Sequence, residues 1–92
     1  MQKGIDGFLD YLRYERNRSE NTVESYRRDL EAFECYFSTL DSELTFATVD
    51  TDIVRDWMEY MLEQGNRATS VARRLSALKT YYRYLLARGY VE

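Results

Sequence analysis

Apolar residues recur along most of the chain at offsets of three and four, the spacing that places side chains on one face of an α-helix. Four stretches have this spacing, at about residues 5–16, 19–40, 50–65 and 68–88. Strand-like alternation is absent, so the pattern predicts an all-α fold, a compact four-helix bundle. The predicted core positions are Ile5, Phe8, Leu9, Leu12, Val23, Tyr26, Leu30, Phe33, Phe37, Leu40, Val54, Trp57, Met58, Met61, Val71, Leu75, Leu78, Tyr82 and Leu85.

Polar residues and glycines mark the ends of these helices. Ser19 and Asp50 are good N-caps, because their side-chain oxygens can accept a hydrogen bond from a first-turn amide. Gly65 and Gly89 fall where helices stop, as left-handed C-caps require. Residues 41–49 form a polar connection, and we expect its apolar side chains to pack against the core: Leu44, Phe46 and Val49.

The composition excludes several classes of chemistry. The 92 residues form one domain, and a hydrophobic fraction of 45% excludes a disordered chain. No apolar run approaches the roughly 18 residues of a membrane span, and no secretory signal pattern opens the sequence. One cysteine, Cys35, and no histidine argue against a disulfide, a transition-metal site and histidine-assisted catalysis. We therefore expect a cytoplasmic chain that has no cofactor and is not itself an enzyme.

Charge is strongly segregated along the chain. Residues 67–92 carry six basic side chains and one acidic side chain, whereas the preceding residues carry seven basic and fifteen acidic ones. The net charge of −3 conceals this division. A basic helix attached to an acidic body needs an anionic partner or a set of internal ion pairs.

A helical wheel of about 100° per residue separates the core face from the opposite face of each helix. The strip of the last helix that faces away from the core consists of Thr69, Arg73, Ser76 and Thr80. Arg74 and Lys79 lie at the core boundary, and we expect their charged heads to reach outward. The matching positions of the second helix are Asn21, Thr22, Ser25 and Arg28. Hydroxyls and guanidinium groups bind phosphate oxygens, and a helix that presents them can lie in a major groove.

These charges also have an explanation that needs no ligand. Arg83 and Arg88 lie near a helix C-terminus, where positive charge favours the helix macrodipole. Arg27 and Arg28 are within reach of glutamates one turn away and can form ion pairs. Packing in the core explains the tyrosines of the last helix better than base stacking does: Tyr81, Tyr82 and Tyr84.

Several segments together resemble a known family, in order and at matching separations. They are residues 8–13 (FLDYLR), 19–22 (SENT), 26–30 (YRRDL) and 70–79 (SVARRLSALK), the last continuing to residues 82–85 (YRYL) and Gly89. This pattern is similar to the start of tyrosine recombinases of the phage integrase and Xer type. Their N-terminal module is a core-binding, SAM-like helical domain that clamps one face of double-stranded DNA. The resemblance implies that the second and fourth helices face DNA through Thr22, Ser25, Arg28, Thr69, Arg73 and Arg74.

Two features depart from the family pattern. The family commonly has a serine or threonine cap before the last helix, and here we expect Asn66 to take over the cap and leave Arg67 free for a phosphate. Family members cut DNA with a tyrosine nucleophile and histidines in a C-terminal domain. Because this chain has no histidine and stops at Glu92, we expect it to be a single N-terminal domain, residues 1–92, without the catalytic domain.

The sequence leaves two functions open. The first is DNA binding, with the candidate residues Asn21, Thr22, Ser25, Arg28, Arg67, Thr69, Arg73, Arg74, Ser76, Lys79 and Thr80. The second is a protein–protein interaction module, in which the first helix or exposed tyrosines dock another recombinase subunit. The family assembles as tetramers, so the two functions can coexist on different faces.

Overall fold

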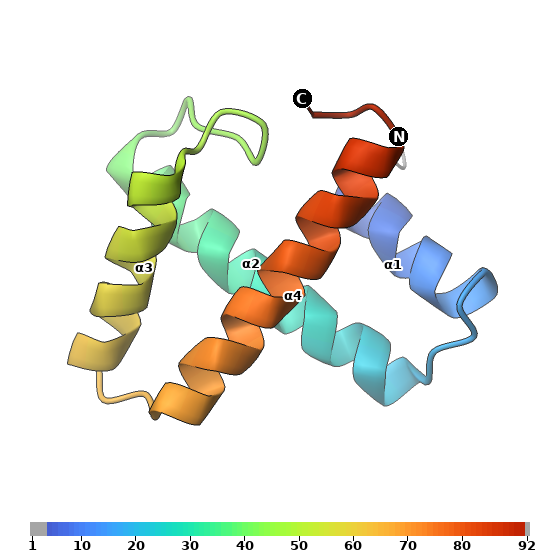
Figure 1. Cartoon of the computed structure of the whole chain (residues 1–92), viewed down its shortest axis with the longest axis horizontal. Coiled ribbons are helices and arrows are strands. Elements are labelled where there is room, and N and C mark those ends of the chain that lie inside the picture. The colour runs from blue at the N-terminus through green and yellow to red at the C-terminus, as the bar shows by residue number, and fades with distance from the viewer. Residues whose placement is uncertain (1–3, 92) are drawn as a thin grey trace.

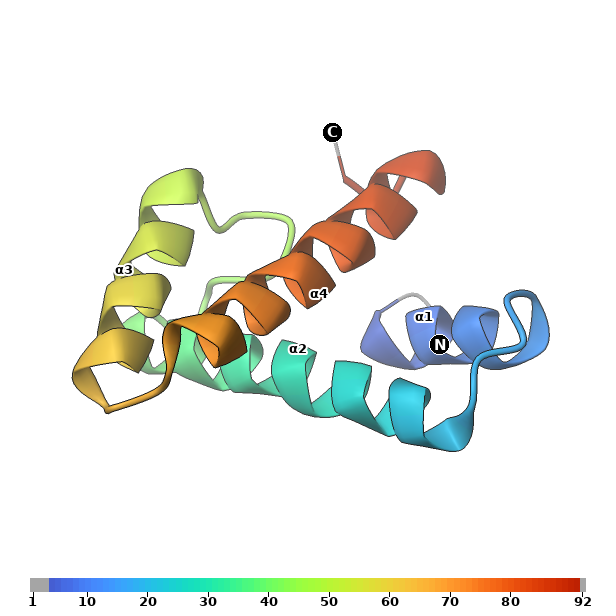
Figure 2. The same cartoon turned by 60° about the horizontal axis from the view of Figure 1, so that its bottom comes forward.

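Four helices make up the described part of the chain, residues 4–91 of a computed structural model. They are α1 (Ile5–Tyr14), α2 (Glu20–Leu40), α3 (Thr51–Glu63) and α4 (Ala68–Ala87). No strand occurs in residues 4–91, so the predicted all-α helical fold is confirmed. In Figure 1, α4 crosses in front of α2, with α3 towards one end of α2 and α1 towards the other. Figure 2 shows the same crossing after a 60° turn.

The two predicted N-caps are confirmed. Ser19 Oγ accepts a hydrogen bond from the Thr22 amide at 3.2 Å, and the Asp50 side chain accepts one from the Ile53 amide at 3.0 Å. Each bond satisfies one of the amides that the first turn of a helix leaves without a partner. The helices α2 and α3 therefore begin where the sequence predicts.

The first helix ends two residues earlier than predicted, at Tyr14. Asn17 takes a left-handed conformation with φ of 53°, which asparagine tolerates better than most residues and which ends the helix. The amide of Arg16 donates to Tyr11 O at 3.1 Å, and that of Arg18 donates to Leu12 O at 2.9 Å. These two bonds fold the α1–α2 loop back onto the last turn of α1.

The link between α3 and α4 departs from the prediction. Gly65 has φ of +91°, and the amide of Asn66 donates to Met61 O at 3.1 Å, which ends α3 in the arrangement known as a Schellman motif. The side-chain amide of Asn66 also donates to Met61 O, at 3.0 Å. The prediction that Asn66 caps α4 is therefore wrong, because its side chain is already bonded to α3. Arg67 occupies the N-cap position without a side-chain hydrogen bond.

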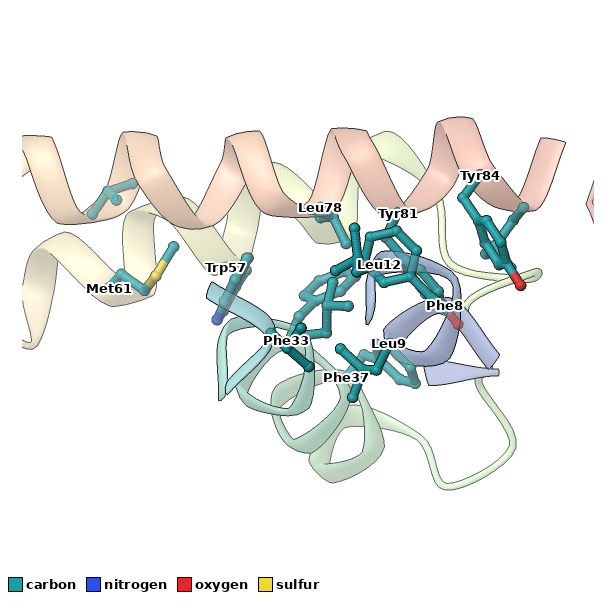
Figure 3. Packing of buried hydrophobic residues seen from close by; sticks show 14 residues of the cluster. Phe8, Leu9, Leu12, Phe33, Phe37, Trp57, Met61, Leu78, Tyr81 and Tyr84 are labelled. Atoms are coloured by element: carbon teal, nitrogen blue, oxygen red, sulfur yellow. The ribbon is translucent and has the colours of Figure 1, made fainter. Parts of the chain in front are cut away.

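The core is aromatic and joins all four helices. Figure 3 shows side chains from α1, α2 and α4 converging around Phe8, Phe33 and Tyr81. The ring centroids of Phe8 and Tyr81 lie 5.2 Å apart, and those of Phe33 and Trp57 of α3 lie 4.8 Å apart. The three connection residues predicted to cover the core also pack against it: Leu44, Phe46 and Val49.

The core predictions fail at the end of α2 and in the second half of α4. Leu40 is 53% exposed, because it is the last residue of α2 and the chain turns away at Asp41. Tyr81 and Tyr84 are buried although the wheel left them out of the core face, because α1 covers this part of α4. Tyr82 packs at the margin of the core and donates its hydroxyl proton to Phe46 O. Packing therefore explains the three tyrosines, as predicted.

Replacing Gly65 tests the turn that sets the start of α4. We expect Gly65→Ala to lower the free energy of unfolding by about 1–2 kcal/mol, because a side chain at positive φ is strained even where space is open. Gly65→Asn is the matched comparison, since asparagine also adds a side chain at this position but tolerates positive φ better than alanine. Urea unfolding of both variants measures the difference, and equal stability of the two would contradict this account of the turn.

Candidate nucleic-acid interface

The interface predicted on α2 and α4 is organised around Asp29. Among residues 4–91 it is the one buried polar or charged side chain, at 5% exposure. Its Oδ1 lies 3.3 Å from Nη2 of Arg73 and 3.7 Å from Nε of Arg74, so two consecutive residues of α4 supply opposite charge. This group ties the middle of α2 to the first half of α4.

Arg73 is held by two contacts to α2. Its Nη1 donates to Ser25 Oγ at 3.1 Å, and its Nη2 faces the Asp29 carboxylate. The side chain nevertheless remains 52% exposed. Because a guanidinium carries five N–H donors, these contacts leave donors for a ligand while they fix the position of the group. Arg73 is thus preorganised at the surface.

The prediction that the charged head of Arg74 reaches outward is wrong. Its Nη1 lies 3.5 Å from Sδ of Met61, and its Nε is buried without a hydrogen-bond partner in the described part of the chain. The side chain is 29% exposed, and its guanidinium lies against α2 and α3. The prediction fails because the buried Asp29 attracts this head inward.

A hollow of about 270 Å³ lies between α2 and α4 beside this group, and we call it the α2–α4 hollow. Four predicted DNA-binding residues line it together with Asp29: Thr22, Ser25, Arg73 and Ser76. The surface therefore offers three hydroxyls and one guanidinium within one concave region. Such a set can donate several hydrogen bonds to the oxygens of one phosphate.

The other predicted residues lie outside this hollow. Arg28 and Asn21 are exposed on α2, and Arg67 and Thr69 are exposed at the start of α4. Thr80 bonds its hydroxyl to Ser76 O at 3.1 Å. Lys79 lies on a different side of α4, in a hollow that it shares with Val49, Asp50 and Leu75. This position agrees with the wheel, which placed Lys79 at the core boundary and outside the exposed strip.

The predicted ion pairs on α2 are confirmed for Arg27 and not for its neighbour. Arg27 lies 3.4 Å from Glu24, 3.9 Å from Glu31 and 3.7 Å from Asp6 of α1. Arg28 forms no ion pair with any residue that the structure describes. Its charge therefore remains available at the surface, close enough to Asp29 to lower the pKa of that carboxyl.

Burial raises the pKa of the Asp29 carboxyl above its ordinary value of 3.8. The positive charges of Arg73, Arg74 and Arg28 lower the same pKa, but the loss of hydration is the larger effect. The ionised group is therefore held in this position at some expense to stability, as is common for buried ion pairs. What the group contributes is the fixed position of Arg73.

The position of Asp29 in the sequence of α2 could have indicated its importance, although it was not among the predicted site residues. Asp29 lies about 40° from the core residue Phe33 on a wheel of α2, which places a carboxylate at the margin of the core. A charge at such a position needs a partner from another element. That rule identifies Asp29 as important without naming Arg73 and Arg74 as its partners.

Comparison with known proteins decides the family. The family model described as "Phage integrase, N-terminal SAM-like domain" matches residues 5–89. The chain belongs to the phage integrase N-terminal SAM-like domain family. The family resemblance seen in the sequence is thus confirmed over nearly all of the chain. No solved structure matches this SAM-like domain.

Curated relatives of the SAM-like domain are tyrosine recombinases. The chain is 36% identical over 88 residues to tyrosine recombinase XerD of Rickettsia bellii, covering 96% of this chain and 28% of that protein. It is 41% identical over 91 residues to tyrosine recombinase XerC of Azotobacter vinelandii, covering 97% and 29%. The third is tyrosine recombinase XerD of Brucella abortus, 41% identical over 86 residues, covering 94% and 27%. The chain therefore spans less than a third of the length of these relatives.

Residues 4–91 contain neither a cluster of metal-binding side chains nor a membrane-spanning helix. Within residues 4–91, no group of three or more histidine, cysteine, aspartate or glutamate side chains has the arrangement of a metal site. In the same part of the chain, no helix combines the length and the apolar character needed to cross a membrane. Cys35 is an exposed free thiol.

The raised pKa of Asp29 predicts that the free energy of unfolding depends on pH, and that Asp29→Asn removes this contribution. The folded chain holds the proton more tightly than the unfolded chain, so it binds more protons between the two pKa values. The contribution of Asp29 to the free energy of unfolding therefore falls as the pH rises through this interval. We expect Asp29→Asn to gain stability relative to the unchanged chain between about pH 4 and about pH 7.

Urea unfolding of both proteins at the two pH values measures this change. Asp52→Asn is the control, because the Asp52 side chain is 80% exposed and pairs only with Arg55 among the described residues. We expect this control to stay within about 0.5 kcal/mol of the unchanged chain. If Asp29→Asn instead lost stability relative to the unchanged chain as the pH rose, the arginines would lower the pKa of Asp29 more than burial raises it.

Proposed function

We propose that this SAM-like domain binds double-stranded DNA through α2 and α4 and so positions a tyrosine recombinase on its core site. The observation that carries the proposal is the fixation of Arg73, which Ser25 and Asp29 of α2 hold at the surface of α4. A guanidinium that is held and half-exposed binds phosphate with little loss of side-chain freedom.

The size of the strip fits a groove of duplex DNA. Thr69 and Ser76 lie seven residues apart on α4, which corresponds to about 10 Å along the helix axis. A major groove is about 12 Å wide and admits an α-helix. We therefore propose that α4 enters the groove, with Thr69 and Ser76 along its exposed side and Arg73 between them.

The start of α4 adds donors at one end of this strip. Arg67 occupies the N-cap without a side-chain hydrogen bond, so the first-turn amides of α4 receive no side-chain cap. Such amides, together with the positive end of the helix dipole, favour phosphate. We propose that Arg67 and Thr69 contact the backbone here, and that Asn21, Thr22 and Arg28 do the same from α2.

The buried carboxylate does not oppose this function. Asp29 is 5% exposed and lies against two guanidinium groups, so the group of three side chains carries a net positive charge. Arg74 completes the charge balance from the inside and is proposed to support Arg73 rather than to reach DNA itself. Thr80 and Lys79 are proposed as peripheral contacts, because neither lines the α2–α4 hollow.

We propose that the domain performs this role as part of a longer recombinase. The relatives named above are tyrosine recombinases of which the chain spans less than a third. We propose that the cutting and joining of DNA is carried out by another part of such a protein and that no tyrosine of this chain is the nucleophile. The isolated domain should bind weakly and with strong salt dependence, because it neutralises few phosphates and its remaining surface is acidic.

Docking to another recombinase subunit is the alternative function. Tyr14 at the end of α1 is 76% exposed, and Tyr60 of α3 is 44% exposed. Sedimentation without DNA separates the two functions, since a docking module associates as its concentration rises. DNA binding by α2 and α4 instead requires duplex and weakens with salt.

Titration of labelled duplex at several salt concentrations tests the DNA-binding proposal. Each phosphate contact contributes about 0.9 to the slope of log affinity against log salt. We therefore expect Arg28→Gln combined with Arg73→Gln to reduce the magnitude of the slope by about 1.8. Arg55→Glu is the control, because it changes the net charge by the same amount from α3 and should retain the slope.

Two results would reject the assignment. The first is the absence of duplex binding by the unchanged chain at low salt. The second is an equal slope for the double variant and the unchanged chain. Thermal unfolding of each variant confirms that the comparison is made between folded proteins.

A further inference from the structure

A second concave region lies beside the proposed interface, between α1, the α1–α2 loop and the second half of α4. It encloses about 370 Å³. Four arginines from three parts of the chain line it: Arg16, Arg18, Arg83 and Arg88. We call this region the arginine hollow. Two of these arginines come from the acidic part of the sequence, so the charge pattern along the chain did not reveal their proximity to α4.

One of the four arginines has partners within the fold. Arg88 lies 3.4 Å from Glu15, and its guanidinium carbon lies 5.0 Å from the ring centroid of Tyr84 and 5.5 Å from that of Tyr11. These contacts are an ion pair and two cation–π interactions that pin the end of α4 to α1. Arg88 therefore has a structural role that needs no ligand.

The other three arginines have no such partners. Arg16, Arg18 and Arg83 are exposed, and none of them forms an ion pair with any residue that the structure describes. Three like charges around one hollow repel one another and create a positive potential there. A bound anion removes that repulsion, so the hollow favours a ligand with several negative charges.

The loop that carries two of these arginines is fixed by the backbone. Asn17 takes a left-handed conformation between them, and the amides of Arg16 and Arg18 donate to carbonyls of α1. The backbone that carries both side chains is therefore fixed relative to α1 before any ligand binds. Such preorganisation reduces the conformational entropy that binding would otherwise lose.

The arginine hollow adjoins the α2–α4 hollow along α4. Tyr26 lines both regions, and Thr80, which lies one turn after Ser76, lines the arginine hollow. Arg83 follows Arg73 by ten residues, which is about 15 Å along the helix axis. This separation exceeds the roughly 12 Å width of a major groove only slightly, so one duplex can reach both regions.

We propose that Arg16, Arg18 and Arg83 form a second phosphate-binding site that holds the backbone of the same duplex. This inference rests on the proposed function, because the ligand is the DNA that α2 and α4 engage. It replaces the explanation of Arg83 by the helix macrodipole, and it adds the α1–α2 loop to the interface. Sequence-independent contacts of this kind fix the register of a protein on DNA.

The test measures salt dependence of duplex binding by Arg16→Gln combined with Arg83→Gln. We expect the magnitude of the log–log salt slope to fall by about 1.8, since each lost phosphate contact removes about 0.9. Arg18→Gln alone repeats the test from the loop, with an expected fall of about 0.9. Arg55→Glu on α3 again matches the change in net charge of the double variant, and Arg55 does not line the arginine hollow.

The outcomes separate this inference from the proposed function. If the unchanged chain does not bind duplex at low salt, both are rejected. If it binds and Arg28→Gln with Arg73→Gln lowers the slope, but the Arg16 and Arg83 variants leave it unchanged, only the second site is rejected. If Arg55→Glu lowered the magnitude of the salt slope equally, net charge would explain the effect and the second site would also be rejected. The second site is supported if the slope falls for the Arg16, Arg18 and Arg83 variants and not for Arg55→Glu.

Discussion

The buried carboxylate of Asp29 fixes how α4 lies on α2. A carboxylate with 5% exposure has lost most of its hydration, so it needs opposite charge within a few ångströms. Arg73 and Arg74 supply that charge, and as consecutive residues they project about 100° apart around α4. The carboxylate lies between the two guanidinium groups. A different rotation of α4 about its axis would remove one of them and leave the buried Asp29 with still less compensation.

This rotation decides which polar side chains α4 presents. With Arg74 directed inward towards Met61, Arg73 emerges at the edge of α2 and reaches Ser25. Ser76 then lines the same hollow, whereas Lys79 falls on a different side of the helix. The polar residues of α4 thus fall on two sides of the helix. Arg73 and Ser76 meet α2, and Lys79 lies beside Val49 and Asp50 at the connection before α3.

Ion pairing divides the basic residues in a similar way. Arg13 and Arg27 are each surrounded by carboxylates of α1 and α2, and Arg55 pairs with Asp52 on α3. Those charges are compensated within the acidic body. The arginines around the α1–α2 loop and along the exposed side of α4 have few such partners in the described chain. Arginines without ion pairs in the described chain therefore gather around this part of α4 and the α1–α2 loop, although the net charge is −3.

The sequence by itself determined the four helices, the caps at Ser19 and Asp50, the glycine turns and nearly all of the core, because these features depend on neighbours within about four residues. It also determined the family. It did not determine the partner of Asp29, the inward direction of Arg74, the bonding of Asn66 to α3 or the burial of Tyr84 under α1. Each of these depends on contact between elements distant in the chain, which a wheel of one helix does not contain. The tertiary structure alone brought Arg16 and Arg18 to α4, because loop closure at Asn17 and the packing of α1 place them there.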